Sequence, residues 1–385
     1  MSSRYTVLPT FSLKERWLTR SYLKLGLKVF VFAWFLITLP LLGESEWSFA
    51  VSGDSRNCGD IVMSAIAPKV RADGAKFYWH LGDYRANYDF DEDMLAATAA
   101  RNQHLAVADY QRTAWSDFIA QQLEPFGDLP VYLAIGNHEL VPPKTRADYL
   151  QQFADWLDTP ELRAQRLRDD PRAHKLTTYY HWIRDGVDFI SLDNASPDQF
   201  DGEQVAWLEK VLARDETDAN IRTVVVGMHD ALPDSVSAGH SMDESPQMEQ
   251  SGRRVYRDLL NLRGKSKKHV YVLASHSHFF AEDVYNDACH PTPETLLPGW
   301  IVGTAGAVRY RLPANLFGAK NAHTDVYGYL LGTVQPNGEV RFLFREVLQK
   351  DISAGVSERY GSKQVTACFE GNKSQYTPAG PDCGK

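Results

Sequence analysis

Short apolar runs alternate with longer polar stretches along the chain after Trp47. Runs rich in β-branched and aromatic residues, bounded by Gly, Asp and Asn, are typical of buried strands. Their alternation with helical stretches predicts an α/β fold built in layers. The expected strands are Trp47–Ser52, Phe77–Leu81, Val131–Ile135, Val187–Leu192, Thr223–Gly227 and Val270–Ala274, and the expected helices are Asp91–Gln122, Arg146–Leu157, Gly202–Ala213 and Gly252–Leu262.

Asp, Asn or His follows the end of five of these expected strands. Open α/β sheets bind ligands beyond the carboxyl ends of their strands, so we expect these side chains to meet at one edge. A single Gly-Asp pair is most often a plain turn, whereas an ordered set after five separate runs is a strong signal. The motifs are Gly53-Asp54-Ser55-Arg56, Gly82-Asp83, Gly136-Asn137-His138-Glu139, Gly227-Met228-His229-Asp230 and Ser275-His276-Ser277-His278.

The residue types in these motifs are those of a metal site. Neutral imidazole and carboxylate groups bind Zn, Fe and similar ions. A carboxylate can also bridge two cations, and two ions about 3.5–4 Å apart clamp the attacking and leaving oxygens of an in-line displacement. The motifs therefore predict hydrolysis at a metal centre.

The ordered motifs resemble those of the calcineurin-like metallophosphoesterase superfamily, which includes the purple acid phosphatases. The resemblance runs from about Trp47 to Val347. The resemblance implies a four-layer α-β-β-α sandwich with two mixed β-sheets and a dinuclear site at their edges. Further segments that resemble the family are the hairpin Thr178–Asn194, the helix Asp201–Leu212 and the strand and Gly-rich turn Gly299–Ala307.

The resemblance also implies a role for each motif residue. Asp83 is the expected bridging carboxylate between two divalent or trivalent ions of Fe, Mn or Zn. His138 is expected to hydrogen-bond a phosphoryl oxygen or to protonate the leaving group, and Glu139 to steady its turn. The ligands expected to complete one metal site are Asn137, His229 and His276, and those expected at the other are Asp54 and His278.

The first motif departs from the family pattern. The family has Asp-x-His, but Arg56 stands where the histidine is expected. Purple acid phosphatases have a Tyr three residues after the bridging Asp, and Ala86 stands there. Arginine stays protonated and cannot donate a lone pair to a metal. Arg56 is therefore expected to grip substrate phosphate in catalysis, with a structural ion pair as the alternative.

His240 is a further expected substrate contact. It lies in the polar segment 233–252, which follows the expected ligand His229 and is the most loop-like internal stretch. Asp230 is a candidate for holding a ligand imidazole in place, with a loop cap as the alternative. The residues after the bridging Asp, namely Tyr84, Arg85 and Asn87, are expected to line the mouth of the site.

Residues 1–28 carry a formal charge of +5, and the apolar run Val29–Leu42 follows them directly. This pattern predicts an export signal or a membrane anchor over residues 23–42, with a buried core helix as the alternative. The rest of the chain would then be periplasmic or otherwise extracytoplasmic. The expected domains are a leader over residues 1–45, a catalytic domain over 46–350 and a tail over 351–385.

Four cysteines are consistent with two disulfides in an exported protein. Cys368 and Cys383 lie close together in sequence and are the first choice of pair, with four free thiols as the alternative.

The whole chain has a formal charge of −8, so the part after residue 28 carries −13. An acidic body argues against a nucleic-acid polymer as partner. The expected function is hydrolysis of a small phosphate ester outside the cytoplasm, by attack of metal-bound hydroxide on phosphorus. A lipid- or nucleotide-linked diester or pyrophosphate is the alternative substrate. A catalytically impaired binding protein is the alternative of another class, and only the missing histidine favours it.

Overall fold

The computed structural model of the protein describes residues 45–97, 105–195, 199–285, 289–316 and 321–381. The chain divides into two units, Met1–Gly43 and Glu44–Lys385, and the described residues all belong to the second. The predicted leader and anchor therefore lie outside the described residues. Within those residues, no helix combines the length and apolar character needed to cross a bilayer.

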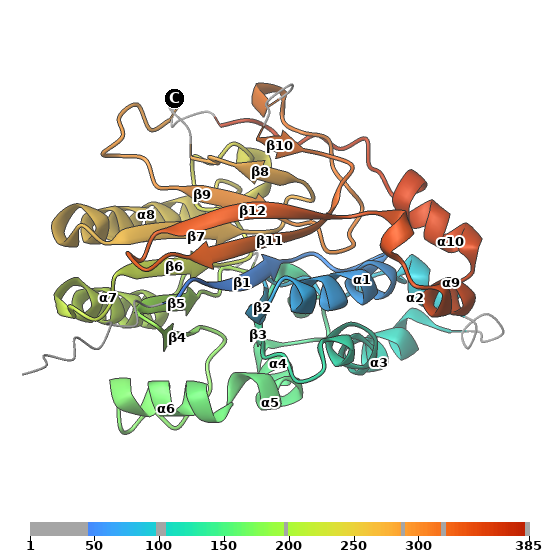
Figure 1. The fold of residues 1–385 in the computed structure, drawn as a ribbon, viewed down its shortest axis with the longest axis horizontal. Coiled ribbons are helices and arrows are strands. Elements are labelled where there is room, and N and C mark those ends of the chain that lie inside the picture. The colour runs from blue at the N-terminus through green and yellow to red at the C-terminus, as the bar shows by residue number, and fades with distance from the viewer. Residues whose placement is uncertain (1–44, 98–104, 196–198, 286–288, 317–320, 382–385) are drawn as a thin grey trace, which may run out of the picture. The chain divides into compact units, whose positions relative to one another are not determined.

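Five strands of the described residues form the first sheet (Figure 1). The strands β1 (Trp47–Ser52), β2 (Ala75–His80) and β3 (Val131–Leu133) pair in parallel. On the side of β1 away from β2, β11 (Tyr327–Val334) pairs with it in the antiparallel direction. The sheet is therefore mixed. Its spatial order is β12 (Val340–Val347), β11 (Tyr327–Val334), β1 (Trp47–Ser52), β2 (Ala75–His80) and β3 (Val131–Leu133).

The second sheet has seven strands among the described residues and is also mixed. Its centre is parallel, and both of its sides end in antiparallel pairs. The predicted hairpin 178–194 is confirmed as β4 and β5. The spatial order is β10 (Ala322–His323), β8 (Phe280–Glu282), β9 (Gly299–Val302), β7 (His269–Ala274), β6 (Thr223–Gly227), β5 (Val187–Ser191) and β4 (Tyr180–Arg184).

Helices connect and cover these sheets. The predicted helix 146–157 is divided in two, and the predicted helix 252–262 is longer than expected, because α8 begins after its capping residue Ser245. The α-helices are α1 (Gly59–Ala72), α2 (Glu92–Ala96), α3 (Val107–Phe118), α4 (Arg146–Gln152), α5 (Ala154–Leu157), α6 (Pro160–Asp169), α7 (Gly202–Thr217), α8 (Pro246–Ser266), α9 (Ala354–Tyr360) and α10 (Ser362–Thr366).

The alternation of side chains along the strands produces four layers. Successive strand residues point to opposite faces of a sheet. Val225 of β6 packs in an apolar cluster between the two sheets, whereas Val224 and Val226 pack with α7 and α8. Likewise Phe49 of β1 faces the second sheet and Ala50 packs with α1. The predicted α-β-β-α sandwich is therefore confirmed.

Aromatic side chains fill the space between the sheets. The ring of Trp182 from β4 lies 5.1 Å from that of Trp79 on β2 and 3.9 Å from that of Tyr132 on β3. Trp79 also lies directly over Gly227, where an added Cβ would be 2.3 Å from the indole ring. The glycine at the end of β6, just before His229, is thus required by packing.

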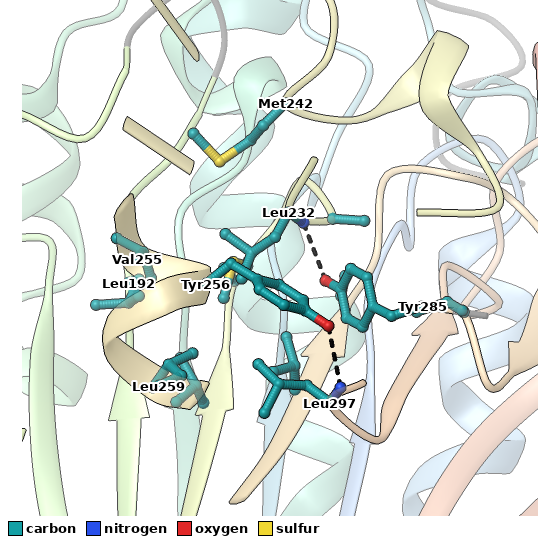
Figure 2. Packing of buried hydrophobic residues seen from close by; sticks show 14 of the residues in the cluster. Leu192, Leu232, Met242, Val255, Tyr256, Leu259, Tyr285 and Leu297 are labelled. Atoms are coloured by element: carbon teal, nitrogen blue, oxygen red, sulfur yellow. Dashed lines mark hydrogen bonds between the residues drawn. The ribbon is translucent and has the colours of Figure 1, made fainter. Parts of the chain in front are cut away.

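Two buried tyrosine hydroxyls accept backbone N–H groups, one in the segment that follows β6 and one in the segment that precedes β9 (Figure 2). The backbone N–H of Leu232 donates to the Tyr285 hydroxyl at 3.1 Å, and that of Leu297 donates to the Tyr256 hydroxyl at 3.0 Å. Met242 packs in the same cluster. The loop that carries His240 is therefore attached to the core on both sides.

The tail after Asp351 is more ordered than its composition suggests. It forms α9 and α10, and Tyr360, Val365 and Cys368 are buried in the cluster that contains α1. The expected pairing of Cys368 with Cys383 is wrong. Cys368 bonds to Cys58, whose Cα lies 5.8 Å away, because the helical tail packs beside the start of α1.

A buried charge cluster joins the second sheet to two of its helices. His181 of β4 donates through Nδ1 to Asp188 of β5 at 2.8 Å and through Nε2 to Asp169 of α6 at 2.5 Å. Arg214 of α7 pairs with both carboxylates, and Asp215 lies beside them. Burial lowers the pKa of His181, but the facing carboxylates outweigh it and raise the pKa to about 9.

This cluster predicts a decline in stability at alkaline pH. The folded pKa of His181 is above its ordinary value of 6.5, so its contribution is complete below pH 6.5 and is lost as pH rises through 9. The lost free energy of unfolding is about 3 kcal/mol. Chemical denaturation between pH 6 and 9.5 should show a smaller slope in His181→Gln than in the wild type and in the exposed-site control His174→Gln, because His181 is one of several groups that lose a proton in this range. Equal slopes in all three proteins would contradict it.

Candidate metal centre

The strand ends of both sheets bring the motif residues together. The backbone N–H of Asp54 donates to Gly82 O at 3.0 Å, which joins the loops after β1 and β2. The N–H of Ser275 donates to His229 O at 2.9 Å, which joins the loops after β6 and β7. The N–H of Gly53 crosses between the sheets to Val302 O at 3.1 Å. All six residues predicted as metal ligands lie at this edge, as the order of the motifs predicts.

Four electron-rich atoms converge at the first candidate metal position. The Nδ1–H of His229 donates to the backbone oxygen of Leu81 at 2.9 Å, so neutral His229 presents the lone pair of Nε2. This Nε2 lies 3.0 Å from Oδ1 of Asn137 and 3.3 Å from Oδ1 of Asp83. Nδ1 of His276 lies 3.0 Å from the same Nε2. Two imidazoles, one carboxylate and one amide oxygen are a donor set that fits Zn, Fe or Mn.

The charges around these atoms favour a cation. Burial lowers the pKa of His229, but the Asp83 carboxylate outweighs it and raises the pKa to about 10. Burial raises the pKa of Asp83, but the facing His138, His229 and Arg56 hold it well below its ordinary value. A metal ion held by all four atoms would supply positive charge here better than a proton, which can be shared by only two of them.

Left-handed turns aim three of the candidate ligands. Asp54, Asp83 and His276 have φ angles of 60°, 60° and 63°. These values lie in the left-handed region of backbone conformation, which residues other than glycine seldom occupy. Such conformations persist where the surrounding contacts impose them, and they concentrate at functional sites. Here the carboxylate of Glu139 accepts the backbone N–H groups of Asp83, Tyr84 and Gly136 at 2.8–2.9 Å, so Glu139 steadies the turn as expected.

The second candidate position has a different environment. Oδ1 of Asp54 lies 3.1 Å from Nε2 of His278, as expected for two ligands of one ion. However, the buried guanidinium of Arg56 lies among the same groups, with Nη2 donating to that Nε2 at 3.1 Å and Nε lying 3.7 Å from Oδ2 of Asp83. The residues at this position do not fit a metal ion while Arg56 is there.

His138 lies beside Asp83, the carboxylate expected to bridge the two positions. Its Nδ1–H donates to the backbone oxygen of Ala86 at 2.6 Å, and its Nε2 lies 3.6 Å from Oδ2 of Asp83. The ring is almost completely buried, and the exposed ring of Tyr88 lies 5.0 Å from it. His138 therefore presents Nε2 toward the centre without belonging to the four converging atoms.

His240 lies next to a candidate ligand. Its ring stacks on that of His276, with centroids 3.7 Å apart and an interplanar angle of 4°. The loop after His229 thus returns to the site, as predicted. Asp230 also contacts His276 rather than His229, with Oδ1 lying 3.6 Å from Nε2 of His276.

The mouth of the site differs from the prediction. Tyr84 packs against Phe118 in the core, and Arg85 is fully buried among carboxylates from Asp60 and Asp117. A cavity of about 280 Å³ instead opens beside Arg56, Tyr88 and Tyr310. Tyr310 follows the Gly-rich turn of Gly299–Ala307, which was the only sequence signal that could have pointed to it.

The family model for calcineurin-like phosphoesterases matches residues 59–280, which is more than half of the chain. The chain belongs to this family. The description of this family is that of phosphoesterases. The match contains the second to fifth motifs and begins after Asp54 and Arg56, so the divergent first motif lies outside it.

Two solved structures resemble the fold. A purple acid phosphatase from yellow lupin (Lupinus luteus) seeds aligns with a TM-score of 0.52 at 16% identity, over 86% of this chain and 57% of that longer chain. PhoD aligns with a TM-score of 0.50 at 15% identity, over 83% of this chain and 77% of that chain. No curated protein matches the sequence significantly.

The substitution Gly136→Ala should weaken metal binding by at least about tenfold, because the added Cβ would lie 2.3 Å from Oδ1 of Asp83 and 3.0 Å from Cε1 of His229. The matched control is Gly264→Ala in α8, where nothing lies within 4 Å. Isothermal titration of the full chain with Mn²⁺ measures the affinities. Equal affinity of the two variants would contradict the placement of the centre.

Proposed function

We propose that the protein is a metal-dependent hydrolase of a small-molecule phosphate ester and that it acts outside the cytoplasm. The observation that carries this proposal is the convergence of Asp83, Asn137, His229 and His276 around one point, with His138 beside it. Family membership supports the same reaction class.

The residues around the centre suit in-line attack on phosphorus. An ion bound there would polarise a phosphoryl oxygen and supply hydroxide at neutral pH. Arg56 adds a fixed positive charge that can hold phosphoryl oxygens through its N–H groups. His138 presents Nε2 toward the same space and can donate a hydrogen bond or a proton to the departing oxygen.

The cavity beside the centre suits a small ester. It has a volume of about 280 Å³, and Tyr88, Phe90 and Tyr310 supply aromatic surface for an organic leaving group. Asp89 and Glu92 also line it. Their negative charges disfavour a long polyanion, in agreement with the acidic body of the chain.

The cysteines support a location outside the cytoplasm. The Cys58–Cys368 disulfide closes the site loop to the tail, and Cys289 is also disulfide-bonded. Such bonds form and persist in oxidising compartments. Protease accessibility of the native chain in intact cells tests this part of the proposal, because digestion from the cytoplasmic side only would contradict it.

A substrate series tests the reaction. The full chain loaded with Mn²⁺, Zn²⁺ or Fe is assayed on nitrophenyl phosphate, bis-nitrophenyl phosphate and a nucleotide pyrophosphate. Hydrolysis of the monoester supports a phosphomonoesterase, and preference for either of the others supports the diester or pyrophosphate alternative. Absence of hydrolysis by a metal-loaded protein would favour a binding protein.

His138→Gln should lower kcat by about 10²- to 10⁴-fold, because it removes the group placed to assist the leaving oxygen. Metal content should stay unchanged, since His138 is not among the four converging groups. His323→Gln, an exposed histidine on β10, is the control with wild-type kcat. The role of His138 is contradicted if kcat persists, or if the bound metal is lost together with activity.

A further inference from the structure

The guanidinium of Arg56 is held where the motifs predict a second ion. Its Nη2 donates to Nε2 of His278 at 3.1 Å, its Nε lies 3.7 Å from Oδ2 of Asp83, and its Nη1 donates to the Tyr88 hydroxyl at 3.3 Å. Arg56 is 7% exposed. The three contacts come from two loops, the one after β2 and the one after β7, so the guanidinium lies inside the centre rather than at its rim.

The lone pair of His278 is already used. The Nδ1–H of His278 donates to the backbone oxygen of Val308 at 2.7 Å, so Nε2 is the atom free to accept. Arg56 donates to that atom. A metal ion would need the same lone pair at about 2.0–2.1 Å. One lone pair cannot serve both, and arginine cannot lose its proton to make way.

The charge balance agrees with this geometry. Asp54 and Asp83 are both fully buried carboxylates. Counted against these two carboxylates alone, one divalent ion together with Arg56 leaves an excess of a single positive charge, and the buried carboxyl groups of Glu139 and Asp230 lie next to the same ligands. A second divalent ion would raise the excess to three charges beside a guanidinium that cannot be neutralised, and like charges repel strongly in a buried site.

The two carboxylate oxygens of Asp83 face different partners. Oδ1 faces Nε2 of His229 at 3.3 Å, on the side of the four converging atoms, and Oδ2 faces Nε of Arg56 at 3.7 Å. The carboxylate therefore bridges a metal position and a guanidinium. In a dinuclear centre the same two oxygens would bridge two ions.

The two residues that follow Arg56 tie its loop in place. The backbone N–H of Asn57 donates to Oδ1 of Asp91 at 2.5 Å, and the Asn57 side-chain oxygen accepts the N–H of Val308 at 3.2 Å. Cys58 is bonded to Cys368. A swing of Arg56 out of the centre would leave the carboxylates of Asp54 and Asp83 without their cationic partner.

We propose that Arg56 replaces the second metal ion and that the protein works with a single ion held by Asp83, Asn137, His229 and His276. The catalytic role that this proposal gives to Arg56 rests on the proposed function. Its structural claim is separate: the centre binds one metal ion per chain. It differs from the pair of ions that the motifs predict. Arg56 then serves as the permanent second cation, placed to hold a phosphoryl oxygen opposite the ion.

Metal stoichiometry tests the proposal. The full chain is loaded with Mn²⁺, and bound metal is measured by elemental analysis and electron paramagnetic resonance. The wild type should bind one ion per chain and show the spectrum of an isolated Mn²⁺. Arg56→His restores Asp-x-His and should bind two ions with the spectrum of a spin-coupled pair. Arg311→His adds a histidine at an exposed arginine and should bind one ion.

Two coupled ions in the wild type would overturn the proposal, as would a folded Arg56→His chain that binds only one. If Arg56→His does not fold, Arg56→Gln removes the charge and should admit a second, weaker ion; failure to do so counts against the proposal. Because the readout needs no substrate, one bound ion without any ester hydrolysis would reject the proposed function and leave this inference standing. If the wild type binds two ions and hydrolyses the esters, the proposed function stands and this inference is rejected.

Discussion

Buried negative charge is the constraint on which the site depends. Asp54 and Asp83 lie at the sheet edges with no exposed surface, and each has a carboxylate oxygen that accepts no hydrogen bond among the described groups. Removing a carboxylate from water is unfavourable unless cations or hydrogen bonds replace the solvent. The neighbouring imidazoles and the guanidinium of Arg56 supply part of that compensation, and the four converging atoms leave a position for a metal ion to supply the rest.

The two-sheet architecture makes such a concentration of charge attainable. Each parallel strand delivers one loop to the same edge, and the aromatic layer around Trp79 and Trp182 holds the two sheets in fixed register. Close approach then depends on small residues at the turns. Gly136 and Gly227 both lie where a single methyl group would meet a neighbour at under 2.5 Å. Acceptor atoms that face one another repel, and a flexible loop would move them apart. Rigid strands and compact turns together hold them in place.

The sequence was most informative where the physics is local or periodic. The alternation of strands and helices predicted a layered α/β fold, and the family resemblance supplied the four-layer order. The polar residues after each run predicted the meeting of Asp83, Asn137 and His229, because strand direction alone carries those side chains to the edge. The direction of Arg56 was left open, since it depends on the left-handed turn at Asp54 and on contacts with His278, more than two hundred positions away. Tyr310 could not be assigned to the mouth for the same reason.

The tail was the least predictable part. Sequence proximity favoured pairing Cys368 with Cys383. That inference neglected tertiary packing: Tyr360 donates to Oδ2 of Asp60 on α1 at 3.2 Å, and that contact brings α9 and α10 beside Cys58. Closeness in sequence predicts which cysteines pair only when the packing of the fold does not bring another cysteine nearer in space.

The Cys58–Cys368 bond also sets an order of events. It joins positions separated by 310 residues, and Cys58 lies only two residues after Arg56. During synthesis, the loop that carries Arg56 emerges long before the segment that fastens it, and contacts of such separation form slowly because a long loop must close first. The loop that carries Arg56 is thus fastened only after a segment some three hundred residues later has been made, and the step that fastens it is an oxidation.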